Sequence, residues 1–500
     1  MLDSGVYNVA SRHAPPRASA MIEALRGLGY NTATALADII DNSIAAGADL
    51  VQLQFDWHED ASRIHLLDNG RGMSSAELDK AMRLGERSPL EVREASDLGR
   101  FGLGLKTASF SQCRRLTVAT INQNGLECLR WDLDVLAASA DDGWHLLEGA
   151  HAGSERFLQP LVDAGKGTMV LWEVLDRIVT KGYAVQDFID LTYQVEQHLG
   201  MVFHRFLADK RLRILLNGRA VRAWDPFLTG HPAKPWSPPP AACPVAREVV
   251  AQCHVLPHRD RLSSKEYDDA AGPRGWTAQQ GFYIYRNERL LVAGSWLGLG
   301  SGRGWTKDEA HRLARIRLDI TNTADTDWKI DIRKSTARPP VAMRAWLIRL
   351  AEVTRARARR AFAHRGKPVG VAQGKPIIEA WKSEKFSGGT RYRIDLEHPS
   401  VRTVLDEAGS LLPQIRAMLR IIEETVPVQR IWVDTAEDKE TPRTGFAGEP
   451  PAEVSSILEV IYGNLITHKG FSPERAREKL LHTEPFHNFP ELIAALPDQP

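Results

Sequence analysis

The stretch ALADIIDNS at residues 35–43 decides the fold that we predict for the first part of this 500-residue chain. Its apolar residues recur at helical spacing, which predicts an amphipathic helix with one buried face. Asp38 and Asn42 lie four residues apart and therefore project from one face of that helix. A carboxylate can polarise a water molecule, and an amide oxygen is a hard ligand for Mg²⁺. The alternative is a polar helix face that only contacts solvent.

A second segment, DNGRGM (68–73), follows the strand-like run RIHLLD (63–68). Its two glycines indicate a tight turn where the backbone can approach a flat ligand. Asp68, just before the turn, carries an ionised carboxylate, which only accepts hydrogen bonds and so suits the exocyclic amine of adenine. The alternative is an ordinary hairpin turn after an edge strand.

The third segment, LGRFGLGLKTAS (98–109), combines three glycines with the start of a helix. Glycines at such a place let backbone N–H groups surround a phosphate at the positive end of the helix. The spacing matches neither the Walker A pattern nor the dinucleotide fingerprint. The charged segment 85–97 before it is typical of a mobile loop, and we interpret it as a lid.

Together, the three segments resemble the GHKL ATPases, the group that includes gyrase, the heat-shock chaperone, sensor histidine kinases and MutL. Within this group the chain is most similar to the prokaryotic relatives of the microrchidia (MORC) ATPases. The resemblance implies ATP and Mg²⁺ as ligands, with Asp38 activating the attacking water and Asn42 binding Mg²⁺. The nucleotide-binding residues that it implies are Asp68, Gly70, Gly72, Met73, Gly99, Arg100, Phe101, Gly102, Leu103, Gly104, Leu105, Lys106 and Thr168.

The residue in the position of the base departs from the family pattern. ATP-hydrolysing members usually carry Glu there, and this chain carries Asp38. An Asp side chain is shorter by one methylene, on the order of 1.5 Å, and a misplacement of about 1 Å can cost roughly a hundredfold in rate. We therefore expect slow turnover.

The composition is that of a globular protein with several domains. Hydrophobic residues make up 43% and charged residues 25% of the chain, and the formal net charge is +1. No overall basic field therefore marks a nucleic-acid binder. The four cysteines form no CxxC pair and indicate no disulfide framework. Because no apolar run reaches about 18 residues, we expect a cytoplasmic protein without membrane contact.

We predict an α/β chain of four parts. Residues 1–20 form an N-terminal arm, 21–215 a GHKL (Bergerat) ATP-binding α/β sandwich, 216–345 a smaller α/β transducer-like domain, and 346–500 a mainly helical C-terminal interaction region. Helical patterns of the ATP-binding part lie at 36–46, 76–84, 103–111 and 184–208, between strand-like runs. The proline-rich segment 231–243 is predicted to be a linker or a long loop.

The segment WKIDIRKSTARPP (328–340) resembles the transducer domain of the MORC-like group. In the family, a lysine from this domain reaches the γ-phosphate. The resemblance assigns this catalytic role to Lys334, with Lys329 as the second choice. An ammonium point charge suits a terminal phosphate. The alternative is a surface lysine ahead of the two prolines that end the segment.

Two further patterns concern packing in the second half. GFYIYRNERLLVAG (281–294) predicts two alternating strands joined by a turn near Arg286-Asn287. Residues 341–365 predict a long helix that is rich in arginine. Such a face can contact nucleic-acid phosphates, or its arginine stems can cover neighbouring helices. The apolar stripe that we expect on this helix consists of Trp346, Leu347, Leu350, Val353 and Ala361.

Taken as a whole, the sequence leads us to expect a slow ATPase that acts as an ATP-gated dimerisation switch. ATP can drive closure only if the closed dimer contacts the γ-phosphate better than the open form does. The resemblance implies DNA, a DNA-processing protein or an antiphage defence complex as the partner. The alternatives are a chaperone-like ATPase acting on protein clients and a protein kinase. The kinase is disfavoured because a histidine kinase needs a dimerising helical hairpin before this domain.

Overall fold

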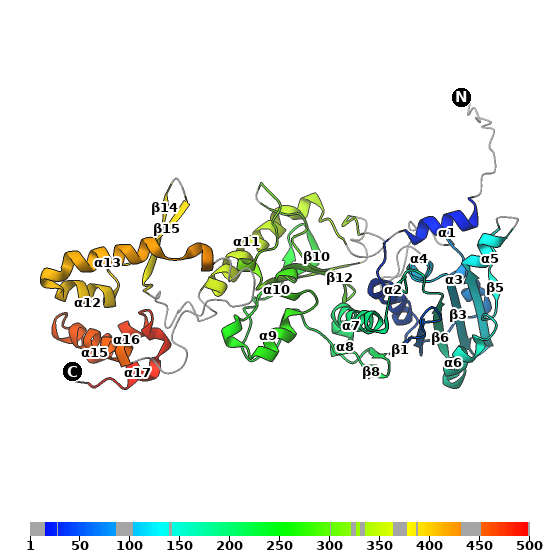
Figure 1. Cartoon of the computed structure of the whole chain (residues 1–500), viewed down its shortest axis with the longest axis horizontal. Coiled ribbons are helices and arrows are strands. Elements are labelled where there is room, and N and C mark those ends of the chain that lie inside the picture. Colours follow the sequence, from blue (N-terminus) through cyan, green and yellow to red (C-terminus); the bar gives the residue numbers. More distant parts are fainter. Residues whose placement is uncertain are drawn as a thin grey trace, which may run out of the picture. The chain divides into compact units, whose positions relative to one another are not determined.

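The computed structural model describes ten stretches of the chain, shown in Figure 1. The chain divides into two compact units, residues 1–359 and 360–500, which we describe separately. The domain boundaries expected at 215/216 and 345/346 remain predictions. The described residues are 16–27, 29–86, 104–139, 143–300, 302–321, 327–330, 336–363, 378–386, 389–431 and 452–498.

An eight-stranded sheet forms the centre of the N-terminal part, in the order β5-β4-β3-β6-β2-β1-β7-β8. Neighbouring strands are antiparallel except β1 and β7, which are parallel. Six of the seven residues of β6 are buried, and most of them are apolar. The strands are β1 (Leu50–Asp56), β2 (Arg63–Asp68), β3 (Arg115–Asn122), β4 (Gly125–Asp132), β5 (Leu147–Glu148), β6 (Gly167–Glu173), β7 (Arg213–Leu216) and β8 (Arg219–Ala220).

Helices cover both faces of this sheet, so the predicted α/β sandwich is confirmed. The main core lies under α2, where Leu36 and Ile40 join Val51 and Leu53 of β1. A smaller cluster on Leu67, Ala119 and Met169 is covered by Leu161 of α6. The helices are α1 (Ala18–Arg26), α2 (Thr32–Ala45), α3 (Ser75–Met82), α4 (Gly104–Phe110), α5 (Leu133–Ala138), α6 (Gln159–Ala164), α7 (Val185–Val202) and α8 (His204–Ala208).

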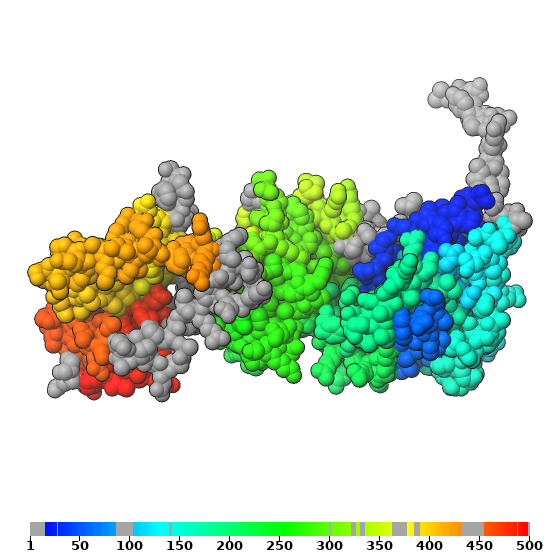
Figure 2. All heavy atoms as spheres, viewed as in Figure 1, coloured from blue at the N-terminus to red at the C-terminus, as the bar shows by residue number. Residues whose placement is uncertain are grey.

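The N-terminal helix overlaps the arm that the sequence predicted. Residues 1–15 of the arm lie outside the described residues, but 18–20 already belong to α1. α1 packs against α4 and α5, and Figure 2 shows its blue outer surface in the first unit. Arg26, buried near its end, donates to the carbonyl of Phe110 in α4 across 2.7 Å.

A five-stranded sheet follows in the same unit, in the order β12-β11-β13-β10-β9. β11 and β13 are parallel, and the other neighbours are antiparallel. The predicted hairpin is present, with Asn287 and Glu288 in its turn at positive φ angles of 46° and 67°, which suit a right-twisted hairpin. The strands are β9 (Ala241–Cys243), β10 (Ala246–Val255), β11 (Gly281–Arg286), β12 (Arg289–Ser295) and β13 (Ala314–Ile320).

Two details of this part differ from the predicted patterns. All six residues of β11 are buried, so its two faces are both covered and the expected alternation of exposed and buried residues is absent. Val353 of α11 (Val341–Ala363) is 59% exposed rather than part of the apolar stripe. The helix turns another face inward, on which Thr354 is fully buried. The buried stripe is Met343, Leu347, Ala351, Thr354 and Ala358.

Two arginines of α11 lie over aromatic rings. The Arg355 guanidinium lies 4.7 Å from the ring centre of Trp296 and 5.1 Å from that of Trp305, and Arg357 lies 4.4 Å from that of Trp236. These contacts favour the packing role for part of the basic surface. Two shorter helices, α9 (Ser264–Ala271) and α10 (Gly275–Ala278), complete this part.

The second unit is mainly helical, as predicted, with one added β-hairpin. β14 (Trp381–Phe386) pairs antiparallel with β15 (Gly389–Ile394). Two of the unit's helices, α15 (Ala452–Thr467) and α16 (Pro473–Leu481), are separated by a turn in which Gly470 has a φ of +65°. The helices are α12 (Pro399–Glu407), α13 (Leu412–Thr425), α15 (Ala452–Thr467), α16 (Pro473–Leu481) and α17 (Pro490–Ala494). In the described part of the chain, we find no helix with the length and apolar character needed to cross a membrane.

Candidate functional site

Helix α2 carries the predicted carboxylate and amide pair. The helix begins after Asn31, whose side chain accepts a hydrogen bond of 2.8 Å from the amide of Thr34 and so caps the first turn. Asp38 is 4% exposed, whereas Asn42, one turn further on, is exposed. The hydroxyl of Tyr30 donates to Oδ2 of Asp38 across 3.0 Å. The carboxylate is therefore oriented inside the fold, and the amide can reach a ligand from solvent.

Asp68 lies at the end of β2 and accepts hydrogen bonds from three directions. The Ser43 hydroxyl donates to Oδ2 across 2.8 Å, and the amides of Gly70 and Thr168 donate to Oδ1 across 2.9 and 3.2 Å. Burial raises the pKa of the Asp68 carboxyl above its ordinary value, although these hydrogen bonds act in the opposite direction. The position of this carboxylate is consequently fixed by α2, the glycine turn and β6 together.

The glycine turn after Asp68 is closely packed. Gly72 has a φ of +71°, and a Cβ at this position would lie 2.2 Å from the carbonyl oxygen of Ile121. A Cβ at Gly70 would lie 3.0 Å from Oδ1 of Asp68. Only glycine therefore fits at Gly72, and the backbone approaches β3 closely.

Met73 and Thr168 are joined through one threonine of β3. The amide of Met73 donates to Oγ1 of Thr120 across 2.9 Å, and Oγ1 of Thr168 lies 3.2 Å from the same atom. Thr168 also faces Asp68 directly in the register of β6 and β2. The structure therefore brings Asp68, Gly70, Gly72, Met73 and Thr168 together around one corner of the sheet.

The described end of the predicted lid approaches α2. A Cβ at Gly104, the first residue of α4, would lie 3.9 Å from Oδ2 of Asp38. Lys106 is 3% exposed, and its ammonium donates to the carbonyl of Ala81 across 2.8 Å. Burial lowers the pKa of Lys106 to about 8. Leu105 is half-buried. Residues 87–97 of the predicted lid lie outside the described residues, as do the predicted nucleotide-binding residues Gly99, Arg100, Phe101, Gly102 and Leu103.

Lys334 also lies outside the described residues. The second choice, Lys329, is exposed and has a φ of +47°. The second sheet nevertheless reaches α2 through another cation, Arg289, the first residue of β12. Its Nε lies 3.1 Å from Oδ2 of Asp41, and its Nη2 lies 3.4 Å from Oδ1 of Asp38.

The sequence analysis missed Arg289, Asp41, Tyr30 and Ser43. Asp41 and Ser43 flank Asn42 in the sequence, and this adjacency is the signal that could have pointed to them. Arg289 gave no such signal, because it reads as an ordinary residue at the start of a strand. Two carboxylates therefore face one guanidinium in this cluster.

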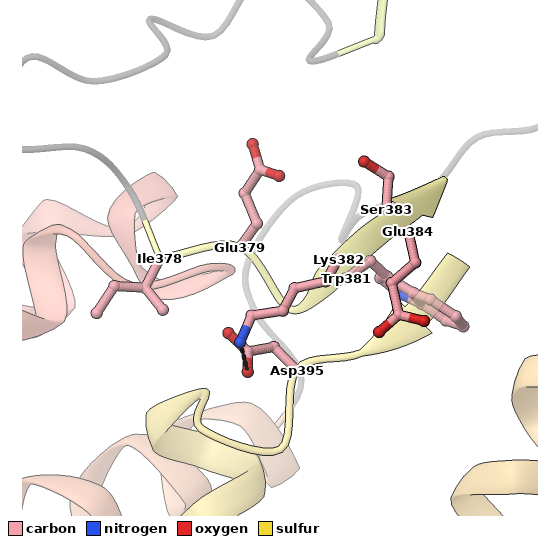
Figure 3. A pocket seen from close by; sticks show the side chains of 7 residues that line it. All are labelled: Ile378, Glu379, Trp381, Lys382, Ser383, Glu384 and Asp395. Atoms are coloured by element: carbon pink, nitrogen blue, oxygen red, sulfur yellow. Dashed lines mark ion pairs between the residues drawn. The ribbon is translucent and has the colours of Figure 1, made fainter. Parts of the chain in front are cut away.

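A separate depression of about 450 Å³ lies in the second unit, along β14. Figure 3 shows Lys382 pointing at Asp395, and Nζ of Lys382 lies 2.6 Å from Oδ1 of that residue. None of the residues predicted to bind nucleotide lines it. The lining residues are Ile378, Glu379, Trp381, Lys382, Ser383, Glu384 and Asp395.

Part of the chain, including most of this site, is similar in sequence to known proteins. Residues 30–168 match the family described as histidine kinase-, DNA gyrase B-, and HSP90-like ATPase. The mouse (Mus musculus) protein ATPase MORC2B is 31% identical over 98 residues, which are 19% of this chain and 10% of that relative. The chain thus covers about a tenth of the length of this relative. The family match at residues 30–168 includes the whole corner from Tyr30 to Thr168 described above.

Proposed function

Because residues 30–168 match the histidine kinase-, DNA gyrase B-, and HSP90-like ATPase family, and a MORC ATPase is similar to this chain over 98 residues, we propose that this chain binds Mg-ATP, hydrolyses it slowly, and uses the nucleotide to control its own dimerisation. The observation that carries the proposal is the buried Asp68 carboxylate, held by Ser43, Gly70 and Thr168. The Asp68 carboxylate and the close-packed glycine turn beside it are suited to binding a purine base.

Adenine recognition follows from the acceptor count at Asp68. A carboxylate offers about four acceptor positions, and among the described residues three donors occupy three of them. The exocyclic amine of adenine would take the fourth. The close backbone at Gly72 and the Thr168 hydroxyl would line the edge of the base, with Gly70 and Met73 on the same turn.

The phosphates and the metal would lie between α2 and α4. Mg²⁺ commonly keeps several waters and binds through few protein ligands together with substrate phosphates, so the exposed amide of Asn42 fits as its protein ligand. When bound, the ion would supply positive charge to the phosphate oxygens. Lys106 and the backbone of the glycine segment from Gly99 to Gly104 would hold those oxygens from the other side.

Asp38 would act as the general base. It would accept a proton from a water molecule whose oxygen attacks the γ-phosphorus. The bond from this phosphorus to the bridging oxygen then breaks, and ADP and phosphate leave. Asp38 is buried and oriented by Tyr30, but its side chain is one methylene shorter than that of Glu, so slow turnover is expected. Lys334 of the second domain would contact the γ-phosphate.

ATP controls dimerisation if it binds the closed dimer more tightly than the open monomer. The partner that we propose is DNA or a DNA-processing or antiphage defence complex. Support for this partner comes only from the similarity of this chain to a MORC ATPase over 98 residues. A chaperone-like action on protein clients would use the same nucleotide chemistry.

The test is a calorimetric titration of the whole chain with Mg-ATP, followed by ATPase assays with and without DNA. We expect uptake of one nucleotide per chain, and hydrolysis that Asp38→Asn abolishes without loss of ATP binding. Asp56→Asn, which removes a carboxylate paired with Arg63 at 3.0 Å, is the control and should hydrolyse ATP like the parent. Absence of uptake at millimolar nucleotide would refute the proposal.

Dimerisation is measured separately by light scattering after size-exclusion chromatography. The chain should become dimeric with a non-hydrolysable ATP analogue and remain monomeric with ADP. Stimulation of hydrolysis by an unfolded protein, but not by DNA, would replace the DNA assignment with the chaperone-like one.

A further inference from the structure

Arg289 connects the second sheet to the helix that carries the proposed base. It follows the turn at Asn287 and Glu288, and its side chain is 4% exposed. Nε donates to Oδ1 of Asp41 across 3.2 Å and lies 3.1 Å from Oδ2 of the same residue. Nη2 donates to Oδ1 of Asp38 across 3.4 Å. The planar fork of a guanidinium can serve both carboxylates at once.

The position of this guanidinium is set by the packing around it. Nη1 donates to the carbonyl of Leu290 across 3.0 Å. Leu290 belongs to a buried cluster with Met201 of α7 and Tyr285 of β11, and the guanidinium lies 6.0 Å from the ring centre of Phe203. Movement of β12 relative to α7 would therefore move the guanidinium that faces Asp38.

We propose that Arg289 is a positioning residue that orients the Asp38 carboxylate for proton transfer. Through Arg289, the rate of hydrolysis depends on how the second sheet packs against α2. The inference rests on the proposed function, in which Asp38 is the base. Tyr30 holds Oδ2 of Asp38 and Arg289 holds Oδ1, so the carboxylate is oriented through both oxygens. Holding both oxygens matters for the short Asp side chain, because a small misplacement of its carboxylate relative to the attacking water would lower the rate of hydrolysis.

The titratable groups around this pair come from several elements. Asp41 lies on α2, Tyr30 just before it, and His198 on α7, where burial and the charges of Arg289 and Arg274 lower its pKa to about 3. His198 is therefore neutral at the pH of an activity assay. Loss of a neighbouring positive charge disfavours the ionised carboxylate.

The experiment compares Arg289→Met, Arg289→Lys and a matched control, Arg205→Met. Arg205 joins the same two parts of the unit, through Asp319 at 2.5 Å and the Tyr285 ring at 3.6 Å. ATP affinity is measured by titration with a fluorescent ATP analogue, and kcat is measured across pH. Thermal melting checks that each variant is folded.

In Arg289→Met we expect kcat to fall on the order of a hundredfold while ATP affinity stays near that of the parent. The acid limb of the pH–rate profile should move upward by about one pH unit. Arg289→Lys keeps the charge but not the fork, so its kcat should fall while the limb stays in place. Arg205→Met should leave the limb unchanged. A merely structural role for Arg289 would not separate the two Arg289 variants in this way.

Parental kcat and an unmoved limb in Arg289→Met would overturn the inference while leaving the proposed function intact. If Arg289→Met does not fold, because two buried carboxylates lose their cation, Arg289→Lys decides. In that case reduced kcat at parental ATP affinity supports the inference and parental kcat overturns it. A parent chain that binds no ATP overturns the proposed function, and this inference with it.

Discussion

The backbone amide of Thr168 donates to Oδ1 of Asp68 across 3.2 Å, although the two residues are 100 positions apart in the sequence. The contact arises because β2 and β6 are neighbours and their register places Asp68 opposite Thr168. Asp68 is thus held by the sheet as well as by its own turn. Its orientation does not depend on a bound ligand.

Asp68→Asn should weaken ATP binding without unfolding the domain. A hydrogen bond to an ionised acceptor contributes enough that its loss lowers affinity roughly ten- to a hundredfold. Ser43→Ala is the matched control, because it removes one donor to the same carboxylate but keeps the acceptor for adenine. Calorimetric titration with Mg-ATP measures both variants. Equal affinities of Asp68→Asn and Ser43→Ala would contradict the adenine assignment.

The same variant tests the pKa of Asp68. Because burial raises this pKa in the folded chain, the folded state binds the proton more tightly than the unfolded state does. The contribution of Asp68 to stability is thus present at acid pH and is lost as the pH rises through the folded pKa. At pH 7 the free energy of unfolding of Asp68→Asn should therefore be at least that of the parent. At acid pH the variant should not be more stable than the parent. Urea unfolding at both pH values measures this, and strong destabilisation at pH 7 would show that the hydrogen bonds outweigh burial.

Gly72→Ala should destabilise the domain more than Gly47→Ala does. Both glycines have a positive φ, of 71° and 75°, but a Cβ at Gly72 meets Ile121 while a Cβ at Gly47 meets nothing within 4 Å. Backbone strain alone costs about 1–2 kcal/mol, and the overlap at Gly72 should raise the loss to roughly 3 kcal/mol or more. The free energy of unfolding from urea titration measures the difference. Equal losses would mean that the turn can move away from β3.

Local elements of the fold could be predicted because burial follows sequence periodicity. The run RIHLLD coincides with β2 (Arg63–Asp68), and the expected long helix coincides with most of α11 (Val341–Ala363). The face that a helix buries is harder to predict when apolar residues occur all round it. On α11 the buried stripe includes Ala351, Thr354 and Ala358, and Val353 faces solvent.

The contacts that assemble the site depend on pairings between distant segments. Arg289 and Asp41 are 248 residues apart, and the hairpin sequence around Arg289 indicates a strand without indicating what its side chain meets. The acids and glycines of the corner could be predicted because the chemistry of each is visible in its own segment. Their orientation by Tyr30, Ser43 and Thr120 requires the folded sheet.

Lys106 should make the stability of the chain depend on pH in the alkaline range. Burial lowers its pKa from 10.5 to about 8, so the unfolded chain binds this proton more tightly than the folded chain does. Stability should therefore rise as the pH increases from about 8 towards 10.5. Lys106→Met should remove that rise. Lys80→Met, at an exposed position on α3, should retain it, and chemical unfolding across this pH range compares the three chains.

ATP binding should be coupled to proton uptake through the same residue. If the phosphates lie against Lys106, their negative charge favours the ammonium form and raises its pKa. A chain that is partly deprotonated near pH 8 should then take up a fraction of a proton as Mg-ATP binds. Calorimetric titrations in two buffers of different ionisation enthalpy measure this uptake. It should vanish in Lys106→Met and persist in Lys80→Met. Uptake that is unchanged in Lys106→Met would place the phosphates away from this ammonium group.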